Sequence, residues 1–453
     1  MIVLGAERRP HDLLRKIDRL FEVSAQKIAA IERDWNPADG APVFTVDGRY
    51  RGRGWTEWTQ GFQVGSALLQ FDATGDREFL LLGRSRTRER MASHLTHTGV
   101  HDHGFNNIST YGQLWRLARE GQFDAPDIEV AFYELALKVS GAVQASRWTA
   151  IADGGFIYSF NGPHSLFVDT IRTLRALAVA HLLGHVLVQE QDARVSLLDR
   201  LREHARTTAT YSVYYGQGRD TYDVRGRVAH ESLFNPVNGS YRGPATQQGY
   251  SPFTTWTRGL AWAMLGFAEE IEFLESTSAV DAFLVDAARA TCDYYIESAA
   301  ADGVPYWDTG APGLASLGDW RSRPADPFND AEPVDSSAAA IAAQGLLRFG
   351  RYLSGIGEDG GRYTQAGLLV LDSLFDPAGP YVSTSPHHQG LLLHSVYHRP
   401  AGWDHVPAGA RTPRGESSMW GDYHAREVAL YVQRLCRGPY LTFFGAEPAR
   451  AAA

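Results

Sequence analysis

Apolar residues recur with helical spacing along nearly the whole chain, and this pattern restricts the possible folds more than any other feature. Apolar side chains at positions i, i+3, i+4 and i+7 are typical of amphipathic helices. The spacing predicts twelve helices, at residues 10–34, 58–73, 76–95, 105–121, 126–145, 165–187, 190–210, 256–272, 278–300, 335–353, 361–375 and 418–435. Strands do not alternate with helices, which argues against a doubly wound sheet or a TIM barrel. Twelve helices indicate an all-α fold of six helical hairpins.

Long connections separate many of these helices, at residues 35–57, 146–164, 211–255, 301–334 and 376–417. Loops of this length without structure of their own are uncommon unless they have a function. Some alternate briefly, as in Tyr211–Tyr215, and we expect short β-hairpins in them. A helical toroid with long loops on one rim accounts for both features, although helix counting alone does not distinguish it from an α-solenoid.

Composition and charge exclude several classes of protein. The chain of 453 residues has a formal net charge of -9, which argues against a nucleic-acid binder because phosphate neutralisation needs a basic face. Its two cysteines are too few for a disulfide framework and favour a reducing compartment. The N-terminal residues contain no apolar run long enough for a signal or a membrane span. We therefore expect a cytoplasmic protein without membrane or nucleic-acid partners, or a periplasmic one if a signal has been removed.

The first candidate for chemistry is a turn that combines His97, His101 and His103 with Asp102. Metal binding is one interpretation, but neighbouring side chains point in different directions and the spacing is not that of histidine ligands on a helix. No metal is expected. A second interpretation is that Asp102 caps the following helix or is simply a turn residue.

The second candidate is Asp169, an acidic residue among Phe167, Val168 and Ile171 at the start of a strongly apolar segment. It either caps a helix or is an ionisable group whose pKa is raised by desolvation. A raised pKa is what a general acid requires at neutral pH.

Aromatic residues near the starts of helices form the third candidate. Arg258 and Trp262 lie four residues apart on one predicted helix, so they can stack on each other or hold an anionic sugar together. The run from Trp55 to Phe62, which includes Trp58, has the same character. Aromatic faces with polar neighbours suit a carbohydrate site. Segments 393–399 and 415–423, which contain His398 and Trp420, either line a pocket rim or close the toroid, and Asp335 is expected to cap a helix.

Taken in order, these segments resemble the family 88 glycoside hydrolases, the unsaturated glucuronyl hydrolases. The resemblance spans about residues 55–435 and depends on seven motifs: WTQGF (58–62), HDHGF (101–105), FVDTIRTLRAL (167–177), QGYSPFTTWTRGLAW (248–262), VPYW (304–307), VDSSAAAIAAQGLL (334–347) and MWGDY (419–423). It implies an (α/α)6 barrel. We expect a single catalytic domain over residues 1–453, with 1–54 as an N-terminal helix and lead-in.

The resemblance also implies a reaction. The family hydrolyses a 4,5-unsaturated uronic acid from the non-reducing end of oligosaccharides left by polysaccharide lyases, by hydrating the C4–C5 double bond and without a cofactor. By motif match Asp169 is the general acid/base, and Asp102 is a second essential carboxylate that orients it or stabilises developing charge. A like charge nearby would also help to keep Asp169 protonated. The residues expected to bind substrate are His101, Trp58, Gln247, Gln248, Arg258, Trp262, Phe160, His398 and Trp420.

Three positions depart from the family pattern, which usually has His at 247, Gln at 260 and Trp near 160, where this chain has Gln247, Leu260 and Phe160. They leave the sugar beyond the scissile bond open. An unsaturated rhamnogalacturonyl hydrolase like those of family 105, a sugar 2-epimerase using histidines such as His101, His394 and His398, and a non-catalytic sugar-binding protein remain alternatives. A monomer or a homodimer is expected.

Overall fold

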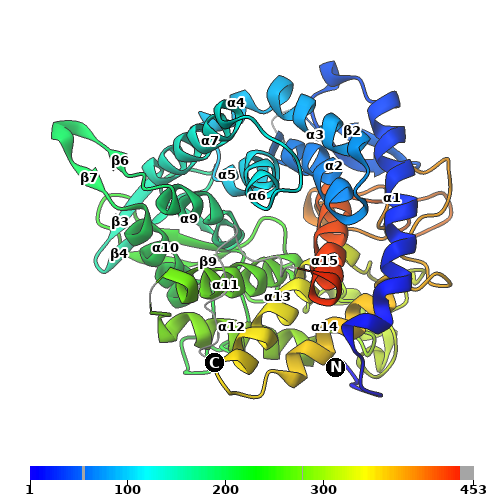
Figure 1. The fold of residues 1–453 in the computed structure, drawn as a ribbon. Coiled ribbons are helices and arrows are strands. Elements are labelled where there is room, and N and C mark those ends of the chain that lie inside the picture. The colour runs from blue at the N-terminus through cyan, green and yellow to red at the C-terminus, as the bar shows by residue number, and fades with distance from the viewer. Residues whose placement is uncertain (54–56, 278, 439–453) are drawn as a thin grey trace.

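The computed structural model describes residues 1–53, 57–277 and 279–438, and its helices form a closed double ring (Figure 1). The inner ring contains α2 (Gln60–Thr74), α5 (His103–Asn107) with α6 (Gln113–Arg119), α8 (Thr170–Thr173) with α9 (Arg175–Leu182), α11 (Thr257–Thr277), α13 (Ser336–Gly355) and α15 (Met419–Arg437). The outer ring contains α1 (Leu14–Asp34), α3 (Arg77–Arg90), α7 (Asp127–Ser146), α10 (Leu197–Tyr211), α12 (Ala282–Ser298) and α14 (Gly361–Leu374). The ring closes because α15 packs against both α13 and α2. The predicted (α/α)6 barrel is confirmed.

Three predicted helices differ from the observed ones in instructive ways. The segment predicted as a helix from 165 begins instead with strand β5 (Ser165–Phe167), because a short buried apolar run fits a strand as well as a helix. The helix predicted from 190 begins at Leu197, after the short strands β6 (Leu187–Val188) and β7 (Arg194–Val195). The helix predicted at 76–95 breaks at Met91, after which α4 (Ala92–Leu95) follows.

Short antiparallel hairpins occupy several of the long connections, as expected. They are β1 (Pro42–Val46) with β2 (Arg49–Gly52), β3 (Trp148–Ile151) with β4 (Gly154–Ile157), and β8 (Glu231–Phe234) with β9 (Tyr241–Ala245). Strand β5 adds to β8 and completes a three-stranded sheet. The hairpin expected around Tyr211–Tyr215 is wrong, since Tyr211 ends α10 and Val213 makes an isolated bridge to Val228. Trp55 and residue 278 lie outside the described residues.

Helix caps and a large apolar core stabilise the barrel. Asp335 caps α13 as predicted, because its carboxylate accepts hydrogen bonds from Ser337 N (3.0 Å) and Ala338 N (3.3 Å). The hydroxyl of Ser418 caps α15 by accepting from Gly421 N at 3.1 Å. A hydrophobic cluster runs from Ile2 to Val432. Among the described helices, none combines the length and the apolar character needed to cross a membrane.

Candidate active site

An open cavity of about 750 Å³ lies where the long loops meet the inner helices. Its lining residues are Trp58, His101, Asp102, Phe160, Phe167, Asp169, Gln247, Gln248, Trp256, Arg258, Trp262, Tyr397, His398 and Trp403. All the residues expected to form the site lie here except Trp420.

The two acidic residues reach the cavity from the starts of two inner helices. Asp102 precedes α5 and Asp169 precedes α8, but neither side chain makes a capping hydrogen bond. The capping interpretation is therefore wrong for both residues. The two helices approach closely at Gly104, where an added Cβ would lie 2.2 Å from the carbonyl oxygen of Thr173. Only glycine fits there, and this contact brings the two carboxyl groups into one site.

His101 lies between the two carboxyl groups. Its Nε2 is 3.6 Å from Asp102 Oδ1 and 3.6 Å from Asp169 Oδ1, so the two oxygens are no more than twice this distance apart. The imidazole is buried, with 2% of its side chain exposed. Gln144 Nε2 holds the backbone by donating to the His101 carbonyl oxygen at 3.0 Å. The arrangement is a compact acid–imidazole–acid triad.

The three pKa values follow from burial and from these neighbours. Burial alone would lower the pKa of His101, but Asp102 and Asp169 raise it above its usual value. Burial raises the pKa of Asp102, and the charge of Asp169 adds to this shift although His101 opposes it. Burial would also raise the pKa of Asp169, but His101 holds it below its usual value. The raised pKa expected for Asp169 is therefore wrong, and Asp102 is the carboxyl group with the raised pKa.

Arg258 is buried at the cavity wall, where its guanidinium is fully engaged with protein groups. Nη2 donates to Gln248 Oε1 and to the Tyr397 carbonyl oxygen, both at 2.8 Å, while Nη1 donates to the Val396 carbonyl oxygen. Nη1 also lies 3.5 Å from the carboxylate of Asp335. Arg258 thus joins Gln248 to the loop that precedes His398.

Arg258 does not stack on Trp262, which was one of the two arrangements that their spacing allowed. The guanidinium lies instead over the rings of Trp256 and Trp420, at 4.7 and 4.6 Å from their centroids. The ring of Trp262 packs against that of Phe105, with centroids 4.9 Å apart. The i, i+4 spacing placed the two side chains on one helix, but it did not determine which aromatic ring covers the charge.

Trp420 does not line the cavity, which corrects its expected role in substrate binding. It has no exposed surface, and its ring stacks on that of Trp58 with centroids 5.1 Å apart. Its Nε1 donates to Ser337 Oγ at 3.0 Å. It therefore supports Trp58 and Arg258 from behind. Leu260 is also fully buried and lies outside the cavity lining.

The aromatic residues Phe160 and Trp58 face the cavity, as do the polar residues His398, Gln247 and Gln248. Phe160 is 38% exposed and its ring is nearly parallel to His101, with centroids 6.3 Å apart. Burial lowers the pKa of His398 to about 4. Gln247 and Gln248 are held by their backbone N–H groups, which donate to His230 Nδ1 at 3.0 and 3.3 Å.

Sequence reasoning missed five residues at this site. Trp256, Phe167 and Tyr397 were within the motifs noted above, whereas Trp403 and His230 were not singled out. His230 is buried beside the cavity and its ring contacts Phe167 and Trp256, with centroids 4.6 and 4.7 Å apart. Trp403 and His230 lie in long loops without helical periodicity, so only their aromatic character could have drawn attention to them.

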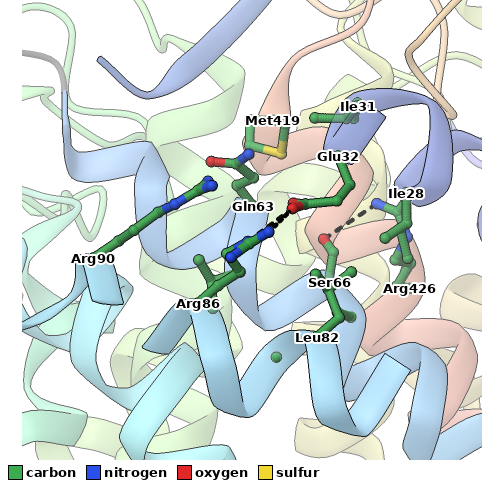
Figure 2. A pocket seen from close by; sticks show the side chains of 13 residues that line it. Ile28, Ile31, Glu32, Gln63, Ser66, Leu82, Arg86, Arg90, Met419 and Arg426 are labelled. Carbon is green, nitrogen blue, oxygen red and sulfur yellow. Dashed lines mark hydrogen bonds and ion pairs between the residues drawn. The ribbon is translucent and has the colours of Figure 1, made fainter. Parts of the chain in front are cut away.

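A second, narrow cavity is separate from this site (Figure 2). It lies among α1, α2, α3 and α15, where Arg86 pairs with Glu32 and the Arg426 Nη1 donates to the Ser66 hydroxyl at 3.3 Å. None of the predicted site residues lines it.

Among the described residues, the group able to hold a metal ion is Asp47, His405 and Glu416, which also lies outside the lining of the main cavity.

Known proteins with similar sequences and structures are carbohydrate-active. The chain is 28% identical over 390 residues to the unsaturated glucuronyl hydrolase of Bacillus sp. (strain GL1), covering 84% of this chain and 87% of that protein. It is 25% identical over 420 residues to the unsaturated chondroitin disaccharide hydrolase of Streptococcus pyogenes serotype M1, covering 90% and 88%. The crystal structure of the Bacillus sp. GL1 enzyme matches with a TM-score of 0.70 and 22% identity, over 93% of this chain and 96% of that one. No protein-family profile matches the chain.

Proposed function

We propose that this chain, a member of the unsaturated glucuronyl hydrolases of glycoside hydrolase family 88, uses Asp169 as its general acid/base to release a 4,5-unsaturated uronic acid from oligosaccharides. The observation that supports this assignment is the pair of carboxyl groups that share His101 inside an aromatic-walled cavity. At no more than twice 3.6 Å, their separation is below the upper limit of about 9.5 Å for paired carboxyl groups in glycoside hydrolases.

The reaction consumes one water molecule, and the proton that Asp169 donates is replaced by one taken from that water. Asp169 donates its proton to C4 of the double bond, which leaves positive charge shared between C5 and the ring oxygen. Water adds to C5, and the Asp169 carboxylate takes the proton that the water loses. The resulting hemiketal opens, and the aglycone leaves without displacement at the anomeric carbon.

The other cavity residues divide into those that orient the acid and those that hold the sugar. Asp102, whose pKa is raised by burial, acts on the opposite side of His101 from Asp169. Trp58 and Phe160 offer ring faces to the C–H faces of the sugar. Gln247, Gln248 and the neutral His398 offer hydrogen bonds to its hydroxyl and carboxylate groups.

The catalytic unit is proposed to be the whole chain rather than a part of it. The residues of the cavity come from the 3-10 turn before α2, the turn before α5, the loop and strand before α8, α11 with the loop before it, and the loop before α15. The hydrophobic cluster that supports them also spans the chain from Ile2 to Val432. Removing either end of the barrel should therefore abolish folding.

A panel of unsaturated oligosaccharides tests the proposal. The disaccharide products of chondroitin, heparin, hyaluronan, ulvan and pectin lyases are incubated with the protein, and loss of the ultraviolet absorbance of the conjugated double bond is followed. We expect turnover of at least one uronide, together with a loss of kcat of about 10³-fold or more in Asp169→Asn, since that variant has no proton to donate.

Asp153→Asn is the matched control, because Asp153 is exposed on the β3–β4 turn and should be replaceable without effect. A flat absorbance trace across the whole panel would contradict the proposal and support sugar binding without catalysis. Residual epimerase activity of Asp169→Asn on a reducing sugar would point to histidine chemistry. Turnover of the pectin-derived product alone would favour the rhamnogalacturonide reaction.

A further inference from the structure

His101 occupies a position that the assignment of Asp169 and Asp102 does not explain. Its Nε2 is equidistant from the two carboxyl groups, at 3.6 Å from each, and neither ring nitrogen has a hydrogen-bond partner. Asp169 Oδ1 is likewise buried and without a hydrogen-bond partner. The ring is covered by Phe160 on one face and meets the edge of Phe167, with centroids 5.8 Å apart. A residue that only held the sugar would not need to lie between the two acids.

The charged surroundings favour a proton on this imidazole. Asp102 and Asp169 face it, and their negative charges stabilise the imidazolium form. Arg147 opposes them, but its guanidinium donates to the carbonyl oxygens of Thr98, Tyr158 and Ser159 and is directed at the backbone. The neighbouring imidazoles His204 and His230 have pKa values of about 3 and 4, because burial disfavours their charged forms. Of these three imidazoles, His101 is the one whose pKa its carboxylate neighbours raise, whereas burial lowers the pKa of the other two.

We propose that His101 is a positioning residue that stores the catalytic proton and passes it to Asp169, rather than a ligand of the uronate ring. The inference rests on the proposed function, since it concerns how the acid of that reaction is loaded. It also assigns to His101 the control of protonation that the family resemblance assigns to Asp102.

The proton cycle closes without a further reactant. The His101 Nε2–H bond breaks as the Asp169 O–H bond forms, which leaves a neutral imidazole and a protonated acid. Asp169 then protonates C4 and afterwards removes a proton from the water that adds to C5. Return of that proton to Nε2 restores the imidazolium. Hydrogen bonds of catalytic groups are often long in an empty site and shorten when substrate expels water, so the 3.6 Å separation is compatible with this transfer.

The pH dependence of kcat/KM tests the inference. In the wild type the stored proton is lost only when His101 is deprotonated, so activity should persist to neutral pH or above. In His101→Asn the proton must be held by Asp169 itself, and the alkaline limb should move to lower pH by about one unit or more. Activity of His101→Asn at its acidic optimum should fall much less than activity of Asp169→Asn. Added imidazole should move the alkaline limb of the His101→Asn profile part of the way back towards its wild-type pH. His164→Asn is the matched control, because His164 is exposed in the same loop as Phe160.

A titration independent of activity separates this inference from the proposed function. With labelled histidine, the NMR signal absent from His101→Asn identifies His101, and its pKa should lie above the usual histidine value and fall in Asp169→Asn. If His101→Asn does not fold, His101→Gln takes its place, and the wild-type titration still decides. An unchanged alkaline limb in an active enzyme, or a lowered His101 pKa, would overturn the inference alone. A wild type inactive on every uronide would instead overturn the proposed function.

Discussion

The close contact between α5 and α8 provides a direct test of how the barrel places its acids. An alanine Cβ at position 104 would lie 2.2 Å from the Thr173 carbonyl oxygen and 2.5 Å from the Thr173 Cα. Non-bonded heavy atoms prefer separations of about 3.5–4.0 Å. Since both opposing atoms belong to the backbone, no side chain can rotate away. The two helices must therefore move apart by about 1 Å in Gly104→Ala.

Two separate losses follow from this displacement. Overpacking of this kind costs about 1–3 kcal/mol of unfolding free energy. Asp102 lies two residues before Gly104, and Asp169 lies four before Thr173, so the movement also enlarges the distances around His101. A displacement of about 1 Å in a catalytic group can reduce the rate by about 10²-fold. We expect kcat/KM to fall by this order even where the variant remains folded.

Denaturant unfolding measures the first loss, and the rate of absorbance decay at a temperature where the variant is folded measures the second. Gly355→Ala is the matched control, because Gly355 is the exposed last residue of α13 and no atom lies within 4 Å of an added Cβ. It should be neutral or more stable by up to about 1 kcal/mol. Full stability and activity in Gly104→Ala would refute the reasoning that this contact sets the separation of the acids.

Three other changes have defined outcomes. Burial raises the pKa of Glu270 well above its usual value, and both of its carboxyl oxygens lack a partner, so the native state favours the protonated form. Between the pKa of Glu270 in the unfolded chain and its higher pKa in the native protein, the native protein therefore binds more protons than the unfolded chain. Glu270→Gln should raise the midpoint of thermal unfolding at alkaline pH and change it little below the unfolded-state pKa. An unchanged midpoint at every pH would contradict this prediction. Phe160→Ala should raise KM several-fold with a smaller effect on kcat, because it removes one ring face of the cavity. Steady-state kinetics in which kcat alone falls would contradict this prediction. Dialysis against a chelator should leave activity intact, since the metal-capable group Asp47, His405 and Glu416 lies outside the cavity lining, whereas strict dependence on a restored divalent ion would disprove it.

Helical periodicity was sufficient to predict the six hairpins, because an amphipathic helix carries its buried face in the spacing of its apolar residues. It failed at 165–187, where the buried run Ser165–Phe167 pairs with β8 instead of joining α8. A run that is apolar on every side has no period, so only the partner strand decides its structure.

The sequence also identified Asp102 and Asp169 as candidates for chemistry but did not decide between a cap and a catalytic group. The structure decides, since neither side chain caps its helix and both meet His101. The direction of the Asp169 pKa shift was also beyond the sequence. Burial and a neighbouring imidazolium act in opposite directions on a carboxyl group, and their balance depends on distances that spacing along the chain does not contain.

The sequence by itself determined the amphipathic helices and the motifs that carry the reactive groups, and the resemblance of those motifs implied the barrel. Tertiary structure alone decided that Trp420 supports Trp58 from behind, that Arg258 lies between Trp256 and Trp420, and that His101 is shared by two acids. The physical reason is that periodicity reports which face of an element is buried, whereas the neighbours of a side chain across the barrel depend on how close two backbones can approach.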